Sequence, residues 1–427
     1  MTRYLTYPTC EWFVEAFGSA EIADWFAASE ALDPVHAPSL AVQIPSLRSR
    51  VSDAQIWLNA FAAETALYAG RLVRGRAIGE MHWTLGRDPL PASWLESLFD
   101  VLASGFYLGR QPRLIASVDP HVAFDVLQCL IAKGFSRIDI GCHANHLTLA
   151  RSSNADELPP VWQQHVLEQA RRLTNLNVSI GIGLQYGVPG QTVDELSRLL
   201  DQVIALRPAR VCCIEMPRAI PRALTAEAER IVPRTNLPML QLATSRLAEA
   251  GYARVTSDTY ALRGDVLEIA QRHGHLMMRP YGGSASAGTT TIALGPAAVG
   301  AVGPVHYQNH RGGHDYVKVL LQDRLPVMRG VSLSADDLIR RAVIHSLSCN
   351  LFVDIDALNL AYGIDFDQHF ATEMPILAQL QQADLIKRNP DTIEIVGDGL
   401  LLVDSICSVF DAYLRRQRSS KPYTTLL

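Results

Sequence analysis

Short apolar runs alternate with longer segments of helical period between residues 38 and 217 of the chain. The apolar runs, each of a length typical of a buried strand, cover residues 40–44, 77–82, 113–118, 137–141, 178–184 and 210–215. The segments between them have helical spacing and plausible end signals, at 52–74, 92–103, 123–133, 160–173 and 192–206. This alternation is typical of βα units that build a parallel sheet. Six such strands predict an incomplete (β/α)6 barrel.

The pattern changes after residue 217. Residues 279–303 are rich in Gly, Ser, Ala and Thr, which predicts a connecting or ligand-covering loop. Farther on, helical stretches at 335–349 and 368–383 precede short runs at 385–388 and 392–396 that predict a hairpin. Helices followed by a small hairpin form a winged-helix pattern. We therefore expect an N-terminal arm at 1–37, a partial barrel at 38–217, a covering and connecting region at 218–330 and a winged-helix-like domain at 331–427.

The ends of the expected strands carry most of the residues with reactive side chains. In a parallel barrel the ligand site gathers where the carboxyl ends of the strands meet. Residues of this rim that suit catalysis are Asp119, Cys142, His143, Tyr186 and Glu215. The second strand would add His82 and Trp83 to the same rim.

Composition and charge exclude several classes of protein. The formal net charge of −5 gives no overall attraction to nucleic acid or to an anionic membrane. The stretch 375–385, where a winged helix would read DNA, has almost no positive charge. No apolar run reaches the length of a membrane span and the first residues do not form a secretory signal, so a cytoplasmic location is expected.

Cysteine and histidine spacing gives only weak indications of a metal. The seven cysteines are an odd number at irregular spacing, which predicts free thiols. His143 and His146 lie beside Cys142 at the end of a strand, where side chains three residues apart do not converge as on a helix. His306, His310 and His314 have helical spacing, but glycines interrupt that segment. Rim or surface histidines are the favoured reading of both groups.

Ordered motifs along the whole chain carry a family resemblance. They include residues 6–9 (TYPT), 118–120 (VDP), 186–192 (YGVPGQT), 336–341 (DDLIRR), 346–350 (SLSCN) and 410–415 (FDAYLR). In this order they resemble the oxygen-independent coproporphyrinogen III oxidases of the radical S-adenosylmethionine (SAM) superfamily. The resemblance implies a partial (β/α)6 TIM-like barrel with a helical, winged-helix-like C-terminal domain.

The resemblance breaks at the element that defines the family's cofactor. The family has CxxxCxxC after the first strand, because three thiolates hold an iron-sulfur cluster and leave one iron open for SAM. This chain has Leu47, Val51 and Ala54 at those positions, and none of the three can ligate iron. We therefore expect no metal and no iron-sulfur cluster.

Other positions that contact SAM in the family are also altered. The family's acidic residue before the VDP motif corresponds to Ser117, the glutamine after the fourth strand to His143, and the aspartate of the fifth strand to Gly183. The glutamine that touches a second SAM corresponds to Gly282, whereas Arg151 would keep one contact. These changes leave SAM binding in doubt.

A tetrapyrrole is a broad apolar disc with carboxylates, so a protein that binds it needs an apolar cleft rimmed by arginine. Arg218 and Arg279 are candidates for the carboxylates, while Tyr260 and Tyr281 have rings that can stack. The expected ligand set is completed by His82, Trp83 and Arg151. The sequence thus favours a cluster-free relative without radical SAM activity, kept as a binding or accessory protein for a tetrapyrrole or a protein partner.

Two alternatives remain open at this point. The rim residues Asp119, Cys142, His143, Tyr186 and Glu215 also suit an enzyme that acts on a small molecule by non-radical chemistry, because a fold alone does not fix a function. The C-terminal domain could instead serve mainly as a protein-interaction surface, which an exposed apolar patch would support.

Overall fold

A long curved sheet organises the molecule. The computed structural model describes residues 4–27, 33, 35–46, 54–72, 76–142, 159–188, 190–216 and 236–419. Among these, twelve strands form one sheet in the order β14-β13-β12-β11-β1-β2-β3-β4-β5-β6-β8-β7. Its middle comprises β1 Ser39–Ile44, β2 Ile78–Leu85, β3 Leu108–Val118, β4 Arg137–Ile140, β5 Ser179–Tyr186 and β6 Arg210–Glu215. Each of these strands pairs in parallel with the next, so the expected incomplete (β/α)6 barrel is confirmed.

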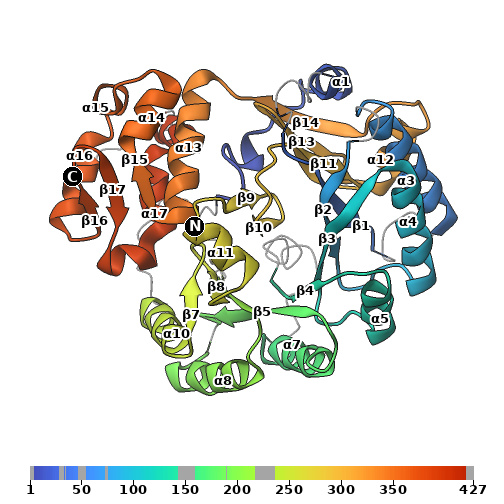
Figure 1. Cartoon of the computed structure of the whole chain (residues 1–427), viewed down its shortest axis with the longest axis horizontal. Helices are drawn as coiled ribbons and strands as arrows, with labels where there is room; N and C mark the ends of the chain where they lie inside the picture. Colours follow the sequence, from blue (N-terminus) through green and yellow to red (C-terminus); the bar gives the residue numbers. More distant parts are fainter. Residues whose placement is uncertain are drawn as a thin grey trace, which may run out of the picture.

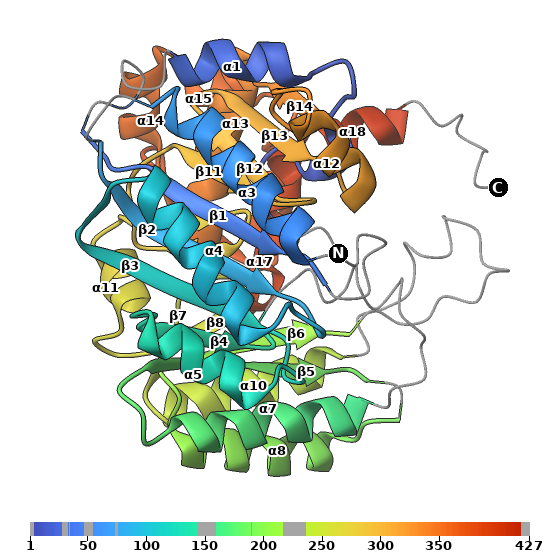
Figure 2. The same cartoon turned by 90° about the vertical axis from the view of Figure 1, so that its right-hand side faces the viewer.

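Helices cover the outer side of this curve (Figure 1). They are α3 Ala54–Ala69, α4 Ala92–Gly105, α5 Phe124–Ala132, α7 Pro159–Leu173, α8 Val193–Leu206 and α10 Leu237–Glu249. Figure 2 shows α3 and α4 lying over β1, β2 and β3. Helix α8 ends at the expected residue 206, whereas α3 ends at Ala69, short of the expected residue 74. No helix in the described ranges is long and apolar enough to cross a membrane.

The start of α8 shows how local sequence sets an element boundary. The side chain of Thr192 accepts a hydrogen bond from the backbone of Glu195, and the carboxylate of Glu195 accepts one from the backbone of Thr192. This reciprocal capping box satisfies two donors that the first turn of a helix would otherwise leave unpaired. Leu196, Leu200 and Val203 follow on one face and are fully buried. The helix therefore begins one residue after the expected bound at residue 192.

Further strands extend the sheet at both edges, where β11 runs parallel to β1 and the other added strands pair in antiparallel fashion. On one side lie β11 Thr291–Leu294, β12 Val299–Val302, β13 Val305–Asn309 and β14 Val327–Ser332, with α1 Ser19–Ala27 and α12 Gly313–Leu320. On the other lie β8 Thr259–Leu262 and β7 Tyr252–Arg254, followed by α11 Val266–Arg272.

Residues 279–303 were expected to form a loop, and for β11 and β12 that expectation is wrong. Strand β11 pairs in parallel with β1, and Ile292 and Leu294 in it are fully buried. Small residues suit this strand because the chains pass close together. A Cβ at Gly295 would lie 2.2 Å from the carbonyl oxygen of Gln43. Glycine here therefore marks a close approach of two chain segments rather than a flexible loop.

A separate hairpin lies inside the curve of the sheet (Figure 1). Strands β9 Met277–Arg279 and β10 Gly282–Ser284 pair in antiparallel fashion around a two-residue turn, Pro280 and Tyr281. Gly282 has a φ of 116°, a backbone conformation that residues with a side chain rarely adopt. The turn therefore depends on glycine at this position.

The C-terminal region forms a second apolar core. It contains the following elements: α13 Ala335–Asn350, β15 Phe352–Asp354, α14 Ile355–Tyr362, α15 Phe366–His369, α16 Met374–Gln382, β16 Ile386–Arg388, β17 Thr392–Ile395, α17 Val403–Cys407 and α18 Ala412–Ser419. The expected hairpin is present as β16 and β17 in a three-stranded sheet.

The N-terminal arm packs into this C-terminal core. Tyr4 and Tyr7 belong to the same apolar cluster as α13 and α14. The hydroxyl of Tyr4 donates to Asp411 Oδ2 at 2.9 Å, and the hydroxyl of Tyr7 accepts from the backbone of Ala412 at 3.2 Å. Residues far apart in sequence thus share one core, and the division into four domains remains a proposal.

Candidate functional site in the barrel interior

Strand β2 supplies the central side chains of the barrel interior. Successive side chains of a strand point to opposite faces, so Glu80, His82 and Thr84 share one face. Glu80 and His82 are 1% and 3% exposed, although both are polar. Buried polar groups of this kind need partners within the protein. The partners come from β3 and from the β9–β10 hairpin.

Glu80 accepts three kinds of donor. The hydroxyl of Tyr281 donates to Oε1 at 2.9 Å, and the hydroxyl of Ser284 lies 2.8 and 3.0 Å from the two carboxylate oxygens. Arg113 Nε lies 3.3 Å from Oε2. The hairpin is thereby fixed to the inner face of β2 by a fully buried carboxylate.

His82 is held between the hairpin and β3. Its Nε2 lies 2.9 Å from Ser117 Oγ, and its ring stacks on that of Tyr281 with centroids 4.5 Å apart. Burial, with a smaller contribution from Arg137, lowers the pKa of His82 to about 3. The imidazole is therefore neutral at pH 7. Two residues of the expected ligand set, His82 and Tyr281, thus lie together in the structure. Their rings contact each other, so each covers a face that a ligand would need.

Trp83 was expected beside His82 at the rim, and the structure contradicts this. Strand β2 continues to Leu85, so Trp83 is an internal strand residue that faces the helices. Its ring packs edge-on against Phe135 at 5.1 Å and lies 6.3 Å from that of Phe99 in α4. The side chain is 1% exposed and belongs to the core.

Tyr260 is likewise a core residue rather than a ligand-stacking ring. It is 1% exposed, and its hydroxyl lies 2.7 Å from Thr244 Oγ1 in α10. Arg254 stacks over its ring at 5.7 Å, and burial raises the pKa of Tyr260 to about 12. The expectation failed because the direction of a single strand residue depends on a register that the sequence does not reveal.

Four of the expected catalytic residues lie at the carboxyl ends of the parallel strands. Tyr186 and Glu215 are paired neighbours at the ends of β5 and β6, and Asn236 Nδ2 lies 3.3 Å from Glu215 Oε1. Asp119 follows β3, and its Oδ1 accepts from the backbone of His121 at 2.9 Å and lies 2.8 Å from His121 Nδ1. The carboxylate of Asp119 thus organises its own turn.

Cys142, the expected catalytic residue with a thiol, follows β4. Burial raises the pKa of Cys142 well above its usual value, with a further contribution from Cys212. A nucleophilic cysteine needs the opposite shift, because the thiolate is the reactive form. The remaining expected residues, namely His143, Arg151, Arg218, Leu47 and Val51, lie outside the described residues.

The residues present do not fit the family's iron-sulfur cluster. Ala54, at the third cysteine position, begins α3, and its carbonyl accepts a hydrogen bond from Trp94 Nε1 at 2.7 Å. The side chains at the three positions are a leucine, a valine and an alanine, which offer no donor atom. Within the ranges that the structure describes, no group of three or more His, Cys, Asp or Glu side chains is placed to hold a metal ion.

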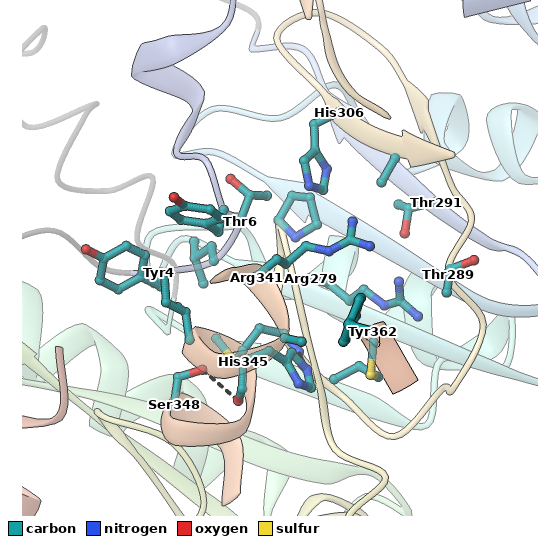
Figure 3. Close-up of a pocket in the computed structure, with 18 residues that line it drawn as sticks. Tyr4, Thr6, Arg279, Thr289, Thr291, His306, Arg341, His345, Ser348 and Tyr362 are labelled. Atoms are coloured by element: carbon teal, nitrogen blue, oxygen red, sulfur yellow. Dashed lines mark hydrogen bonds between the residues drawn. The ribbon is translucent and has the colours of Figure 1, made fainter. Parts of the chain in front are cut away.

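A cavity of about 210 Å³ lies where the N-terminal arm, the β9–β10 hairpin and α13 meet. Arg279, an expected ligand residue, lines it together with Arg341, His306 and His345 (Figure 3). Thr291, the first residue of β11, also lines the cavity, and it pairs with Ser39, the first residue of β1. The cavity is therefore near the amino ends of these strands, opposite the rim.

Comparison with known proteins identifies the family. No protein-family model matches the chain. The oxygen-independent coproporphyrinogen III oxidase of Pseudomonas aeruginosa is 30% identical over 444 aligned residues, which cover 98% of this chain and 95% of the relative. The chain belongs to the oxygen-independent coproporphyrinogen III oxidase family. The Escherichia coli oxidase is 27% identical over 445 residues, covering 100% of this chain and 95% of that protein.

The solved structures agree with this assignment. Coproporphyrinogen III oxidase (HemN) from Escherichia coli, a radical SAM enzyme, matches with a TM-score of 0.81 at 26% identity, over 96% of this chain and 97% of that chain. The radical SAM type of barrel and the resemblance drawn from the sequence are thus confirmed.

Sequence reasoning missed several residues of the interior. Glu80 and Ser284 belong to no quoted motif, and the two hairpin partners of Glu80 lie 201 and 204 residues away from it in the sequence. Alternation along β2 was the available signal for Glu80, because it shares the face of His82 two residues on. Arg341 lies in the stretch 335–349 for which the sequence predicted a helix, and only the tertiary structure places it at a cavity.

Proposed function

We propose that this protein is a cluster-free member of the family, without radical SAM oxidase activity, that serves as a binding or accessory protein for a tetrapyrrole. The observation that carries the proposal is the set Leu47, Val51 and Ala54 at the three cysteine positions. Cluster iron in this family type is held by thiolates, and apolar side chains cannot replace them. Without a cluster there is no electron source for cleaving SAM.

Contacts in the barrel interior support the same proposal. Ser117, at a position where the family has an acid, is hydrogen-bonded to His82. Gly183, at the expected aspartate position, leaves no room for a side chain, since a Cβ there would lie 2.3 Å from the carbonyl oxygen of Gly141. Gly282 holds a positive φ in place of a glutamine. At each position the surroundings are adapted to the residue present.

Retention of an ordered scaffold favours a remaining function. Caps, core and buried polar pairs agree with one another across the described chain, which is the consistency that specifies a single fold. The relatives are named for their action on coproporphyrinogen, a tetrapyrrole. Arginine binds carboxylates such as those of a tetrapyrrole through paired N–H donors. Arg279 is a candidate for this contact, because it is buried and lines a cavity.

The decisive test of the cluster-free proposal is anaerobic reconstitution. Purified protein and the Escherichia coli relative would be treated in parallel with iron and sulfide, and then assayed for bound iron and for conversion of coproporphyrinogen III with SAM. We expect the relative to acquire iron and activity and this protein to acquire neither. Stoichiometric cluster iron together with oxidase turnover in this protein would sink the proposal.

The binding role is tested by titration with coproporphyrin, heme and SAM. Absorbance and thermal unfolding report binding, because a ligand at 100 times its Kd stabilises the folded state by about 2.7 kcal/mol. We expect saturable binding of coproporphyrin or heme at one site. If none of the three ligands saturates, the tetrapyrrole role is wrong and a protein partner becomes the leading candidate.

The rim geometry disfavours the alternative of an enzyme with non-radical chemistry. Such an enzyme would use Cys142 as a nucleophile or Asp119 as a base. Burial raises the pKa of Cys142, and Asp119 is engaged by His121. Covalent labelling of Cys142 by iodoacetamide at neutral pH, faster than that of free cysteine, would revive this alternative.

A further inference from the structure

The cavity between the N-terminal arm, the hairpin and α13 is positively charged. None of its 18 lining residues is an aspartate or a glutamate. Arg279 is 4% exposed; it donates to the backbone oxygen of Ser286 at 3.0 Å, and its Nε has no partner among the described residues. Arg341 lines the same cavity, and no carboxylate of the described residues forms an ion pair with either guanidinium. Figure 3 shows both arginine side chains between His306 and His345.

The charged groups in this cavity face one another rather than acids. Burial lowers the pKa of Arg341, and the positive charge of Arg279 lowers it further. The phenol of Tyr362 shifts this pKa in the opposite direction. Burial also lowers the pKa of His306 to about 3 and of His345 to about 4, with the two arginines adding to the shift. Both imidazoles are therefore neutral at pH 7. The buried Arg279 and the half-buried Arg341 have no carboxylate partner among the described residues, an arrangement that is costly unless an anion compensates it.

We propose that this cavity binds the carboxylate of an organic acid with an apolar body, held between Arg279 and Arg341. A guanidinium matches the two oxygens of a carboxylate through paired N–H donors. The rest of the lining includes Leu5, Met277, Met278, Pro280, Ala301 and Ile344, which suit an apolar body and not a fully hydrated anion such as phosphate.

The size of the cavity limits the ligand. Its volume is about 210 Å³, below the roughly 300–1,000 Å³ of pockets that enclose a drug-sized molecule. A whole tetrapyrrole does not fit inside it. A small acid fits, as does one carboxylate arm of a larger molecule. The site goes beyond the function proposed above, because it lies at the opposite end of β1 from the cluster position.

The walls of the cavity are fixed before any ligand binds. Tyr4 and Tyr7 line one side and are hydrogen-bonded to Asp411 and Ala412 in the C-terminal region. His345 accepts a hydrogen bond from the backbone of Met278 at 3.3 Å, which ties α13 to the hairpin. Pre-formed walls reduce the entropy lost on binding.

The test is calorimetric titration of the full chain, as purified and without iron or SAM, with hexanoate, 1-hexanol and inorganic phosphate at pH 7. We expect saturable binding of hexanoate only. Arg341→Gln should weaken it at least tenfold, about 1.4 kcal/mol, and Ala342→Leu should weaken it by filling the cavity. The matched control is Arg110→Gln, since Arg110 is exposed on β3 and does not line the cavity.

Thermal unfolding of each variant shows whether it folds. If Arg341→Gln does not fold, the binding measured with the cavity-filling variant Ala342→Leu still tests the proposal. The proposal is overturned if 1-hexanol binds as well as hexanoate, if only phosphate binds, if nothing saturates, or if Arg341→Gln and Ala342→Leu both bind like the unsubstituted chain. These results are separable from those of the cluster test. A cluster with oxidase activity would end the proposed function and leave the carboxylate site standing.

Discussion

The ring of Tyr281 stacks on the imidazole of His82, with centroids 4.5 Å apart, while its hydroxyl donates to Glu80 at 2.9 Å. One side chain from a hairpin turn thus occupies the inner face of β2 and satisfies a buried carboxylate. The barrel interior is closed at this point by the protein's own residues. The expected ligand residues His82 and Tyr281 are therefore available to a ligand only if the hairpin moves.

Substitutions at Tyr281 separate the two contacts. Tyr281→Phe keeps the stacked ring but removes one donor from a buried carboxylate, so we expect a loss of about 1–3 kcal/mol in the free energy of unfolding. Tyr281→Ala should cost about 3–5 kcal/mol, because it also leaves a cavity. Urea denaturation measures both. Tyr107→Phe is the matched control, since Tyr107 is 57% exposed and should change stability little. Equal effects of Tyr281→Phe and Tyr107→Phe would contradict a structural role for the hydroxyl.

Periodicity was sufficient to predict the order of the barrel elements. Strands and helices with a continuous apolar face, such as β6 and α8, lie close to their expected bounds. It was not sufficient where a strand end decided which way a residue faces. The expected end of the second strand at His82 put Trp83 at the rim, whereas the strand continues to Leu85 and turns Trp83 into the core.

Long-range convergence was the other limit of the sequence. The cavity joins Tyr4 of the arm, Arg279 of the hairpin and Arg341 of α13, which local spacing cannot relate. The strands β11 and β12 were missed for a different reason. Their segment is rich in small residues because it passes close to β1, as Gly295 shows, and small residues read locally as a loop.

Restoring the cysteines should not restore the enzyme. In the triple variant Leu47→Cys, Val51→Cys, Ala54→Cys, we expect iron uptake after anaerobic reconstitution, because three thiolates are again present. We expect no conversion of coproporphyrinogen III, because Ser117 and Gly183 still depart from the SAM site of the family. Iron content and oxidase assays measure the two parts. The triple serine variant at the same positions is the control for the thiolates. Oxidase turnover by the triple cysteine variant would show that the other substitutions are unimportant.

Gly183 should tolerate no side chain. A Cβ at this position would lie 2.3 Å from the carbonyl oxygen of Gly141, and backbone cannot move aside as a flexible side chain can. We expect Gly183→Ala to cost about 1–3 kcal/mol in the free energy of unfolding, and Gly183→Asp more, because the larger group also brings a charge into a buried strand. Gly86→Ala is the control, since nothing lies within 4 Å of its Cβ position. If Gly183→Asp proved as stable as Gly86→Ala, the SAM-site aspartate would fit this fold after all.

Glu64 should make the stability of the fold depend on pH in an unusual direction. It is fully buried, and its described partners are neutral donors: the backbone of Gly295 at 2.8 Å, the amide of Asn309 at 2.7 Å, and the hydroxyl of Tyr316. Burial raises the pKa of Glu64 from 4.5 to about 7, although these hydrogen bonds oppose the shift. The folded state therefore binds a proton that the unfolded state has already released between these two values.

Stability from Glu64 is thus complete below pH 4.5 and is lost as the pH rises to about 7. At 1.36 kcal/mol per unit, the loss is about 3 kcal/mol. Glu64→Gln cannot titrate, so subtracting its urea-denaturation profile from that of the unsubstituted chain between pH 4.5 and 8 isolates this contribution from the other groups. Gln55→Glu is a control that adds an exposed carboxylate to the same helix, and it should leave the pH dependence in this range nearly unchanged. A difference profile that is flat, or that rises with pH, would mean that Glu64 is already ionised in the folded protein at pH 5 and that its three donors outweigh its burial.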